Sequence, residues 1–184
     1  MKNISIILRQ DQEKILPIIH TKGSENYKIS VKLAGRGAKL TLLGAFKLSD
    51  EDQVKVNITI DHQVPDTVSD TLIKASLADK SVGSFFGLVK IKKGAKNTNT
   101  YFREDALLLS DTAKATAVPS LEIDENEIKA GHASSVGPLD PEQLFYLQSR
   151  GINKTEAREI ITKGFFAPVL EKLAEKNKRR FLND

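Results

Sequence analysis

The residues able to do chemistry in this chain are few, and cysteine is absent from all 184 positions. A chain without cysteine forms no disulfides, offers no thiolate to zinc and has no thiolate nucleophile, so any sulfur chemistry requires another subunit. Of the three histidines, His132 is expected in a polar turn, KAGHASSVG, between a strand that ends near Ile128 and the Asp140 cap, where a neutral imidazole can coordinate a metal such as iron. The alternative is that His132 only makes a hydrogen bond across an interface. His132 is therefore the first candidate for metal binding.

A carboxylate and a second histidine are weaker candidates. Glu122 lies between two apolar residues, so in a strand its side chain points away from theirs, toward solvent or a partner. There it can act as an electrostatic or ligand group, or simply be solvated. His62 follows an alternating segment and precedes Pro65, which favours a hydrogen-bonded cap on the end of a strand over a secondary metal contact. Three phenylalanines are expected to stack in the protein interior rather than bind a ligand: Phe85, Phe86 and Phe102.

The arrangements of residues expected of several enzyme classes do not occur in the sequence. A β-helical carbohydrate-active enzyme needs paired carboxylates along a groove, and a hexapeptide acyltransferase with His132 as general base needs an aliphatic residue every six positions. The sequence has neither pattern, nor the GxxxxGK(S/T) loop that binds nucleotide phosphates. We therefore expect a non-enzymatic protein that binds no nucleotide. A pure interaction module remains an open alternative.

Alternating apolar and polar residues dominate the first two-thirds of the chain, up to about residue 131. This period of two is typical of strands with one buried face. The two-residue Asn-Gly and Asp-Gly turns of β-hairpins are absent, which favours stacked coils of parallel sheet over an antiparallel sandwich. We predict parallel coils over about residues 20–131, with an interior that contains Ile29, Val31, Val56 and Ile58.

Helical signals replace this pattern after residue 137. A first helix is expected between an Asp140 cap and Gly151, and a second between an Asn153 cap and Gly164. Pro168 should open a last helix that is amphipathic and basic. The prediction is a β-helix core domain at residues 1–137 and a C-terminal helical region at residues 138–184.

Composition limits the partners and the location of the protein. A net charge of +4 is too small and too dispersed to mark a nucleic-acid-binding protein. No segment approaches the roughly 20 apolar residues of a membrane span. Arg9 interrupts the apolar run near the N-terminus, which does not resemble a signal peptide. We expect a cytoplasmic protein with neither nucleic acid nor a membrane as its partner.

Several motifs in a single order resemble the SufB/SufD family of the SUF iron-sulfur cluster assembly system. Two are short: LAGRGA at residues 33–38, and HQVP at residues 62–65 with Ser69. The third is the run ALLLSDTAKATAVPSLEIDENEIKAGHASSVGPLDPEQLFYLQSRG at residues 106–151, which is similar to the family over its whole length. The resemblance begins at Leu33 and covers about four-fifths of the chain.

This resemblance implies a right-handed parallel β-helix followed by a helical region. It also implies a scaffold subunit that pairs with itself or with a SufB-like homologous subunit and docks a SufC-like ATPase of the ABC type. The histidine that matches His132 lies at the family's subunit interface, where a transient iron-sulfur cluster is built, and Glu122 is a second possible cluster-binding residue. The ATPase would dock on one helical segment, at Leu144, Phe145, Tyr146, Leu147 and Arg150, for which structural packing is the alternative role.

The chain departs from the family pattern in two places. Full-length members carry an additional N-terminal domain, whereas here the alternating pattern begins almost at once. SufD-like relatives have a cysteine where Ala130 stands and retain the histidine at 132, so the softest iron or sulfur ligand is missing. Without any cysteine, the chain is most similar to a short SufD-like core domain.

Overall fold

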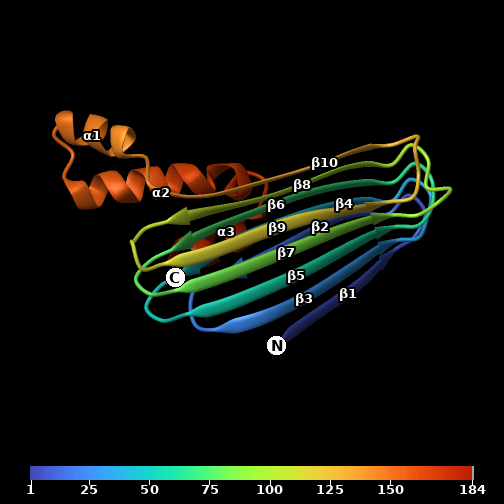
Figure 1. Cartoon of the computed structure of the whole chain (residues 1–184), viewed down its shortest axis with the longest axis horizontal. Coiled ribbons are helices and arrows are strands. Elements are labelled where there is room, and N and C mark those ends of the chain that lie inside the picture. Colours follow the sequence, from blue (N-terminus) through green and yellow to red (C-terminus); the bar gives the residue numbers. More distant parts are fainter. Residues whose placement is uncertain (184) are drawn as a thin grey trace.

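Strands precede all of the helices in the computed structural model, which describes residues 1–183 (Figure 1). The strands are β1 (Lys2–Leu8), β2 (Glu13–His20), β3 (Glu25–Leu33), β4 (Lys39–Leu48), β5 (Gln53–His62), β6 (Val68–Leu77), β7 (Val82–Ile91), β8 (Asn99–Leu108), β9 (Lys114–Ile123) and β10 (Lys129–Pro138). The helices are α1 (Pro141–Ser149), α2 (Lys154–Leu170) and α3 (Glu175–Asn183). The strands extend beyond the predicted range of 20–131 at both ends.

Successive strands alternate between two five-stranded sheets. The odd-numbered sheet has the order β1-β3-β5-β7-β9, and the even-numbered sheet has the order β10-β8-β6-β4-β2. All pairings are parallel, so each odd strand and the following even strand make one coil of a right-handed β-helix. The predicted fold class, a right-handed parallel β-helix followed by a helical region, is confirmed.

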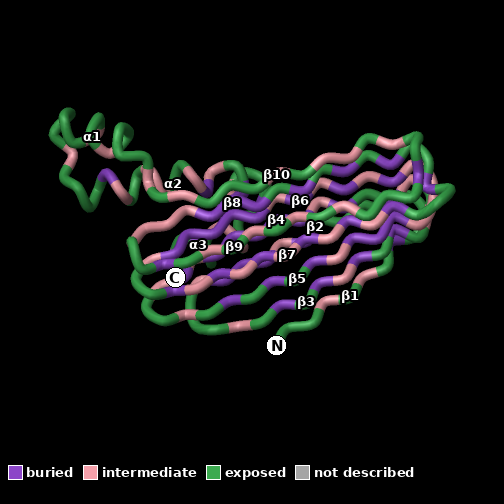
Figure 2. The backbone as a smooth tube through the Cα atoms, in the orientation of Figure 1, coloured by how far each residue is buried: buried purple, intermediate pink, exposed green. Residues whose placement is uncertain are grey.

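The core lies between the two sheets, and the backbone alternates between buried and more exposed residues along most strands (Figure 2). Parallel in-register pairing stacks like residues, as in the pair Ile29 and Ile58, both of which are buried. Phe85 and Phe102 are buried as predicted. Phe86 is only partly buried and lies beneath the Lys55 ammonium, because it has the opposite phase of alternation to Phe85. The prediction that Phe86 lies in the interior is therefore wrong.

Aspartate and asparagine make tight corners between successive strands. Five such residues have positive φ angles, namely Asp11, Asp50, Asp66, Asp79 and Asn97. Their short polar side chains tolerate the left-handed conformation better than other side chains with a Cβ atom. At one corner the Asp66 carboxylate accepts hydrogen bonds from Arg36 and from Asn97, at 2.6 and 2.9 Å. These corners explain why the chain turns repeatedly without hairpin-type Asn-Gly turns.

The C-terminal helices cover part of the outer face of the even-numbered sheet. Phe166, Val169, Leu173 and Phe181 form a second buried cluster with β2 and β4 residues. Helix α2 continues through Gly164 and contains Pro168, so the predicted helix end at Gly164 and helix start at Pro168 are wrong. Packing of the neighbouring apolar residues offsets the hydrogen bond that proline cannot make. Within the described residues, no helix has the length and apolar character needed to cross a membrane.

The helix caps follow the sequence closely. The Asp140 side chain accepts the backbone N–H of Glu142, and the Asn153 side chain accepts that of Glu156. Gly151 follows the first helix with a φ of +86°, as expected for a residue that terminates a helix. Strand β10 ends at Pro138. The division into domains at residues 1–137 and 138–184 stays a prediction.

Candidate functional site at the open end of the β-helix

The last coil of the β-helix is open on one side. Strand β9 pairs only with β7, and β10 pairs only with β8, so each ends its sheet. In the described chain no further strand stacks on this coil, and β10 therefore presents a row of unpaired backbone groups. Such an edge is a template for pairing with another strand.

His132 lies on this edge strand. It pairs in register with Phe102 of β8, whose side chain fills the interior, so His132 belongs to the inward-facing series of β10. His132 is nevertheless exposed, as is Val136 farther along the same face. The segment that contains His132 was expected to be a polar turn, and this is wrong: its alternation continues the in-register pairing with β8. Ala130 also faces inward and packs partly against the core.

Glu104 lies one strand inside this open end. It is 1% exposed, and it is in register with Ser134 of β10. Neither carboxyl oxygen has a hydrogen-bond partner of normal geometry. Burial raises the pKa of Glu104 to about 7, and the backbone N–H of Val118 opposes this effect only in part. A buried carboxyl group whose pKa is raised by burial is typical of functional sites.

A cluster of charges on the outer face holds β10 in place. Asp105 receives hydrogen bonds from Arg103 at 2.8 Å and from the Ser135 hydroxyl of β10 at 2.9 Å, and pairs with Lys74 at 2.9 Å. Burial would raise the pKa of Asp105, but these hydrogen bonds bring it below its ordinary value. The Lys74 ammonium also lies 4.4 Å from the ring centre of Phe165 in α2. The same cluster therefore contacts both the edge strand and the helical region.

Glu122 lies on a different face from His132. Its side chain is exposed on the outer side of β9 and pairs with Lys90 at 2.7 Å. The hydrogen bond to Glu122 raises the pKa of Lys90. Register places Lys32, Asp61, Lys90 and Glu122 in one row across the odd-numbered sheet, with alternating charge. This row favours a solvated ion-pair role for Glu122.

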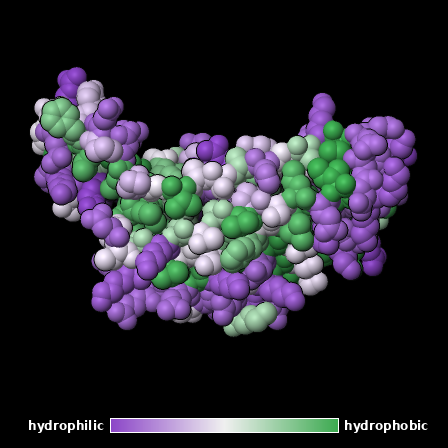
Figure 3. All heavy atoms as spheres, viewed as in Figure 1, coloured by the Kyte–Doolittle hydropathy of each residue, from purple (hydrophilic) through white to green (hydrophobic). Residues whose placement is uncertain are grey.

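Hydrophobic side chains also gather across the middle of the face shown in Figure 3, which carries the odd-numbered strands, and hydrophilic residues cover its right-hand end. Val118 of β9 is one of the exposed apolar residues of the outer side, at 44%. Like Glu122, it points away from the interior. This outer face brings none of the predicted site residues toward His132.

Helix α1 carries the residues predicted to bind a partner. Leu144 and Leu147 are half-buried, whereas Phe145 and Tyr146 are 72% and 56% exposed. Arg150 lies over the ring of Tyr146, 5.2 Å from its centre. The helix packs beside α2 and projects from the β-helix (Figure 1). A groove of about 870 Å³ runs between the two helices. Exposed aromatic residues beside an apolar groove are typical of a protein-binding surface.

His62 lies in the closed middle of the molecule and is wholly buried. Its Nδ1 atom is 2.8 Å from the Thr67 hydroxyl, and its Nε2 atom is 2.9 Å from the Ser69 hydroxyl. Ser69 is in turn 2.7 Å from the hydroxyl of Thr100. Burial lowers the pKa of His62 to about 4. The predicted role of His62 as a hydrogen-bonding cap is confirmed.

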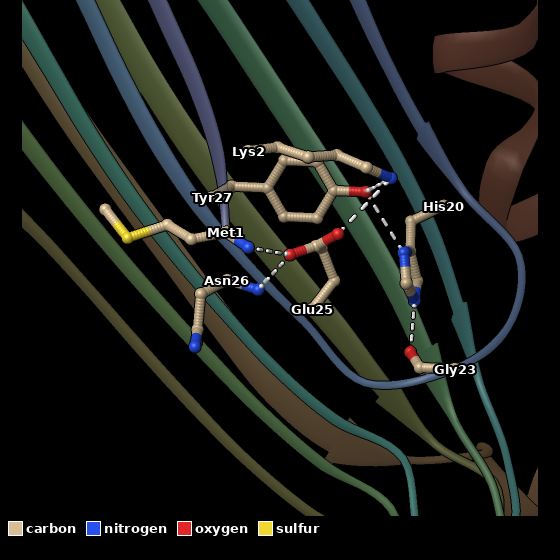
Figure 4. Close-up of polar contacts among 7 residues, drawn as sticks. All are labelled: Met1, Lys2, His20, Gly23, Glu25, Asn26 and Tyr27. Carbon is tan, nitrogen blue, oxygen red and sulfur yellow. Dashed lines mark hydrogen bonds and ion pairs between the residues drawn. The ribbon is translucent and has the colours of Figure 1, made fainter.

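His20 belongs to another polar cluster, near the first strands (Figure 4). Its Nε2 atom lies 2.8 Å from the Gly23 carbonyl. A carbonyl can only accept, so Nε2 carries the proton and Nδ1 accepts from the Tyr27 hydroxyl at 3.1 Å. Lys2 donates to the Tyr27 oxygen at 3.4 Å and pairs with Glu25 at 3.6 Å. Burial lowers the pKa of His20. Every ring nitrogen is thus partnered, which makes the cluster structural.

Sequence reasoning missed Glu104, although the signal was present. Thr100, Phe102, Glu104 and Ala106 alternate along β8 and all point inward. A carboxylate in phase with buried apolar residues is costly unless it is paired or functional. The phase of the strand alone therefore marks Glu104.

The fold and the site together define a class of protein. It is a right-handed parallel β-helix with an open last coil, a histidine and a buried carboxyl at that coil, and a projecting helical pair. Comparison with known proteins identifies the family more closely. The model of the SufBD core domain, described as SUF system FeS cluster assembly, matches residues 18–165. The chain therefore belongs to the SufBD family.

Individual relatives agree with this assignment. The chain is 37% identical over 164 residues to an iron-sulfur cluster assembly SufBD family protein of Mycobacterium leprae, covering 84% of this chain and 42% of the relative. It is 38% identical over 152 residues to a SufBD family protein of Mycobacterium tuberculosis, covering 78% and 38%. It is also 45% identical over 103 residues to the iron-sulfur cluster assembly protein SufD of Bacillus subtilis, covering 55% and 24%. The chain thus spans about two-fifths of the length of the two mycobacterial relatives.

Proposed function

We propose that this chain is a non-enzymatic scaffold subunit for iron-sulfur cluster assembly in the cytoplasm. The observation that carries the proposal is the free edge of β10. His132 lies on the inner face of this strand and is still exposed to solvent. Pairing of this edge with a second copy or with a SufB-like subunit would bring His132 to a shared interface. A transient cluster would form there as cargo, with sulfur and thiolate ligands supplied by other subunits, because this chain has no cysteine.

The helical region supports a second part of the proposal, the docking of an ABC-type ATPase. Phe145 and Tyr146 offer exposed aromatic surface, with Arg150 beside them and with Leu144 and Leu147 partly buried at the base. Aromatic and arginine side chains dominate the energetics of many protein interfaces. The ATPase would provide the nucleotide-binding loop that this sequence lacks.

The decisive experiment is reconstitution of cluster assembly from purified components: this chain, the ATPase, a sulfur donor and a cysteine-bearing homologous subunit. Replacing His132 by Ala should lower the rate at which iron and sulfide accumulate, because one ligand is lost. Replacing Glu122 by Gln serves as the matched control and should leave the rate unchanged, since Glu122 is on the outer face. Equal rates for wild type and His132→Ala would contradict cluster binding and favour the alternative, an interaction module without a cluster.

Self-association has its own test. We expect the chain alone to form a homodimer through β10. Ser134→Pro should weaken it: the Lys129 N–H is hydrogen-bonded on the β8 side, so by the alternation of a strand the Ser134 N–H lies on the free side of β10, and proline removes it. Sedimentation at concentrations of about 10 to 100 μM detects such weak association. A monomer over this whole range would contradict pairing between identical copies and leave only a longer homologue as partner.

A further inference from the structure

A second cavity lies between α2, α3 and the even-numbered sheet. Its volume is about 600 Å³, which is within the range of pockets that hold small organic ligands. Helix α2 forms one wall, and the rest of the lining comes from α3, from Lys47 of β4 and from Leu109, which follows β8. None of the lining residues belongs to β10 or to α1. The cavity is therefore separate from the edge strand and from the helix that carries the predicted partner-binding residues.

The wall formed by α2 changes from charged to apolar along the helix. Five of its lining residues follow one another at every fourth position: Lys154, Arg158, Thr162, Phe166 and Leu170. Residues four positions apart are neighbours on a helix surface. At 1.5 Å per residue, the series extends over about 24 Å. The first two residues are cations, the third carries a hydroxyl group and the last two are hydrophobic, so the cavity has one charged end and one apolar end.

The apolar end is held open by contacts between α3 and the sheet. The rings of Phe166 and Phe181 are both buried and meet edge to face, with 4.6 Å between their centres. The Lys47 ammonium donates to the Phe181 carbonyl at 2.5 Å and lies 4.5 Å from the centre of its ring. Leu170 is only partly buried, and Leu182 is 55% exposed. Fixed aromatic walls with accessible leucines beside them provide a preformed surface for an apolar chain.

The charged end has an excess of positive charge. The one carboxylate in the lining, Glu159, pairs with Lys163 at 3.7 Å. Within the described residues, Lys154 and Arg158 form no ion pair with a carboxylate, and the Arg158 guanidinium donates instead to the Leu109 carbonyl. A guanidinium has five N–H donors, so others remain for an anion. The start of α2 adds the positive end of the helix dipole. This end of the cavity is therefore complementary to an anionic head group.

We propose that this cavity binds a free fatty acid, with its carboxylate at Arg158 and Lys154 and its hydrocarbon tail against Phe166, Leu170 and Leu182. The positive charge and the apolar wall belong to one cavity of limited volume, which fits a single chain with one charged head better than a two-chain membrane lipid. The proposal goes beyond cluster assembly and does not rest on it.

Calorimetric titration of the full chain with saturated fatty acids, each below its micelle concentration, tests the apolar end. Laurate should bind at one molecule per chain. From octanoate through decanoate to laurate, the dissociation constant should fall roughly fourfold for each added methylene group, as expected when the tail is buried. Leu182→Gln should weaken laurate binding several-fold. Ile160→Gln is the matched control, because Ile160 is an exposed apolar residue of α2 that does not line this cavity, and it should bind laurate like wild type.

The charged end is tested with the same ligand. Arg158→Gln should weaken laurate binding about tenfold, since it removes charge-assisted hydrogen bonds. Lys154→Gln changes an exposed residue that holds no other part of the structure, and it should weaken binding about two- to fivefold. Lys176→Gln removes the same charge from α3 outside the cavity and should have no effect. Circular dichroism checks that each variant is folded.

Several results would overturn the fatty-acid site. They are the absence of saturable laurate binding, an affinity that does not depend on chain length, and wild-type binding by Arg158→Gln and Lys154→Gln together. Binding to phosphatidylglycerol vesicles without binding to monomeric laurate would assign the surface to a membrane instead. Laurate binding that appears only when the protein is diluted would show that a second copy of the chain fills the cavity.

Discussion

Two regions of the β-helix contain a histidine beside inward-facing polar groups. They differ in how far these groups are buried and hydrogen-bonded. In the closed middle, His62 is wholly buried and both ring nitrogens meet hydroxyl groups. At the open end, His132 is exposed, and Glu104 is buried with no hydrogen-bond partner of normal geometry. Satisfied polar groups stabilise a structure, whereas unsatisfied ones near a free strand edge are available to a ligand. The difference separates a structural histidine from a candidate functional one.

The largest expected loss of stability comes from placing a charge in the core of the closed middle. Ile58→Asp should lower the free energy of unfolding by several kcal/mol, because it places an unpaired charge at a position that is 2% exposed. Thr59→Asp is the matched control. Thr59 is the next residue along β5, points to the outer face and is only partly buried, so the substitution should lower the free energy of unfolding by about 1 kcal/mol or less. Urea denaturation of both variants provides the measurement. Equal losses would mean that the coil's two faces are not distinguished as the alternation requires.

Lowering the pH should destabilise the folded protein, because His62 is buried in its neutral form. The pKa of His62 falls from 6.5 to about 4 on folding, so between these values the unfolded chain binds a proton that the folded chain does not. Stability from this group is therefore complete above pH 6.5 and is lost as the pH falls toward 4, by up to about 3 kcal/mol. Urea midpoints measured from pH 7 to 4 should fall more steeply for wild type than for His62→Gln. Parallel profiles would show that His62 does not govern this loss.

Raising the pH should destabilise the folded protein at the open end, because Glu104 is buried and holds its proton more tightly in the folded chain. The pKa of Glu104 rises from 4.5 to about 7 on folding, so the folded chain holds the proton more tightly than the unfolded chain. The contribution is present below pH 4.5 and is lost as the pH rises through 7, by about 2 to 3 kcal/mol. The stability difference between Glu104→Gln and wild type should therefore shift in favour of the variant by this amount from pH 4.5 to 8. Metal-free buffer is needed, and a pH-independent difference would contradict the raised pKa of Glu104.

The sequence predicted much of the closed middle because local rules agree there. Alternation of residues such as Ile29 and Val31 gives strand phase, and the absence of Asn-Gly turns argues against hairpins. Alternation does not by itself say which phase faces inward when two aromatic residues are adjacent, as at Phe85 and Phe86. The predicted helix end at Gly164 and helix start at Pro168 were also wrong, because packing of α2 against the sheet outweighed the local preference of those two residues.

The open end was predictable only in part. His132 was found from its residue type and from the resemblance to the family, but its place in a strand depends on pairing with β8, about 30 residues earlier. Glu104 was missed because a carboxylate among alternating residues is normally assigned to the solvent side. Its phase shows that it points inward, because it alternates with Phe102 and Ala106 along β8. Long-range pairing, rather than local pattern, brings this site together.

The smallest expected effect on folding, and the sharpest test of orientation, concerns β10 itself. His132→Ala should change the free energy of unfolding by no more than about 0.5 kcal/mol, because exposed side chains outside caps and networks contribute little. Ala130 lies two residues away on the same face, so Ala130→Cys should place a thiolate beside the imidazole and increase the iron retained after desalting. Ala133→Cys is its matched control: Ala133 pairs with Arg103 of the outward-facing series, and its thiol would point away from His132. Equal iron retention by the two cysteine variants would mean that the inner face of β10 is not the assembly side, whereas retention by Ala130→Cys alone would place the metal on the face shared with Glu104.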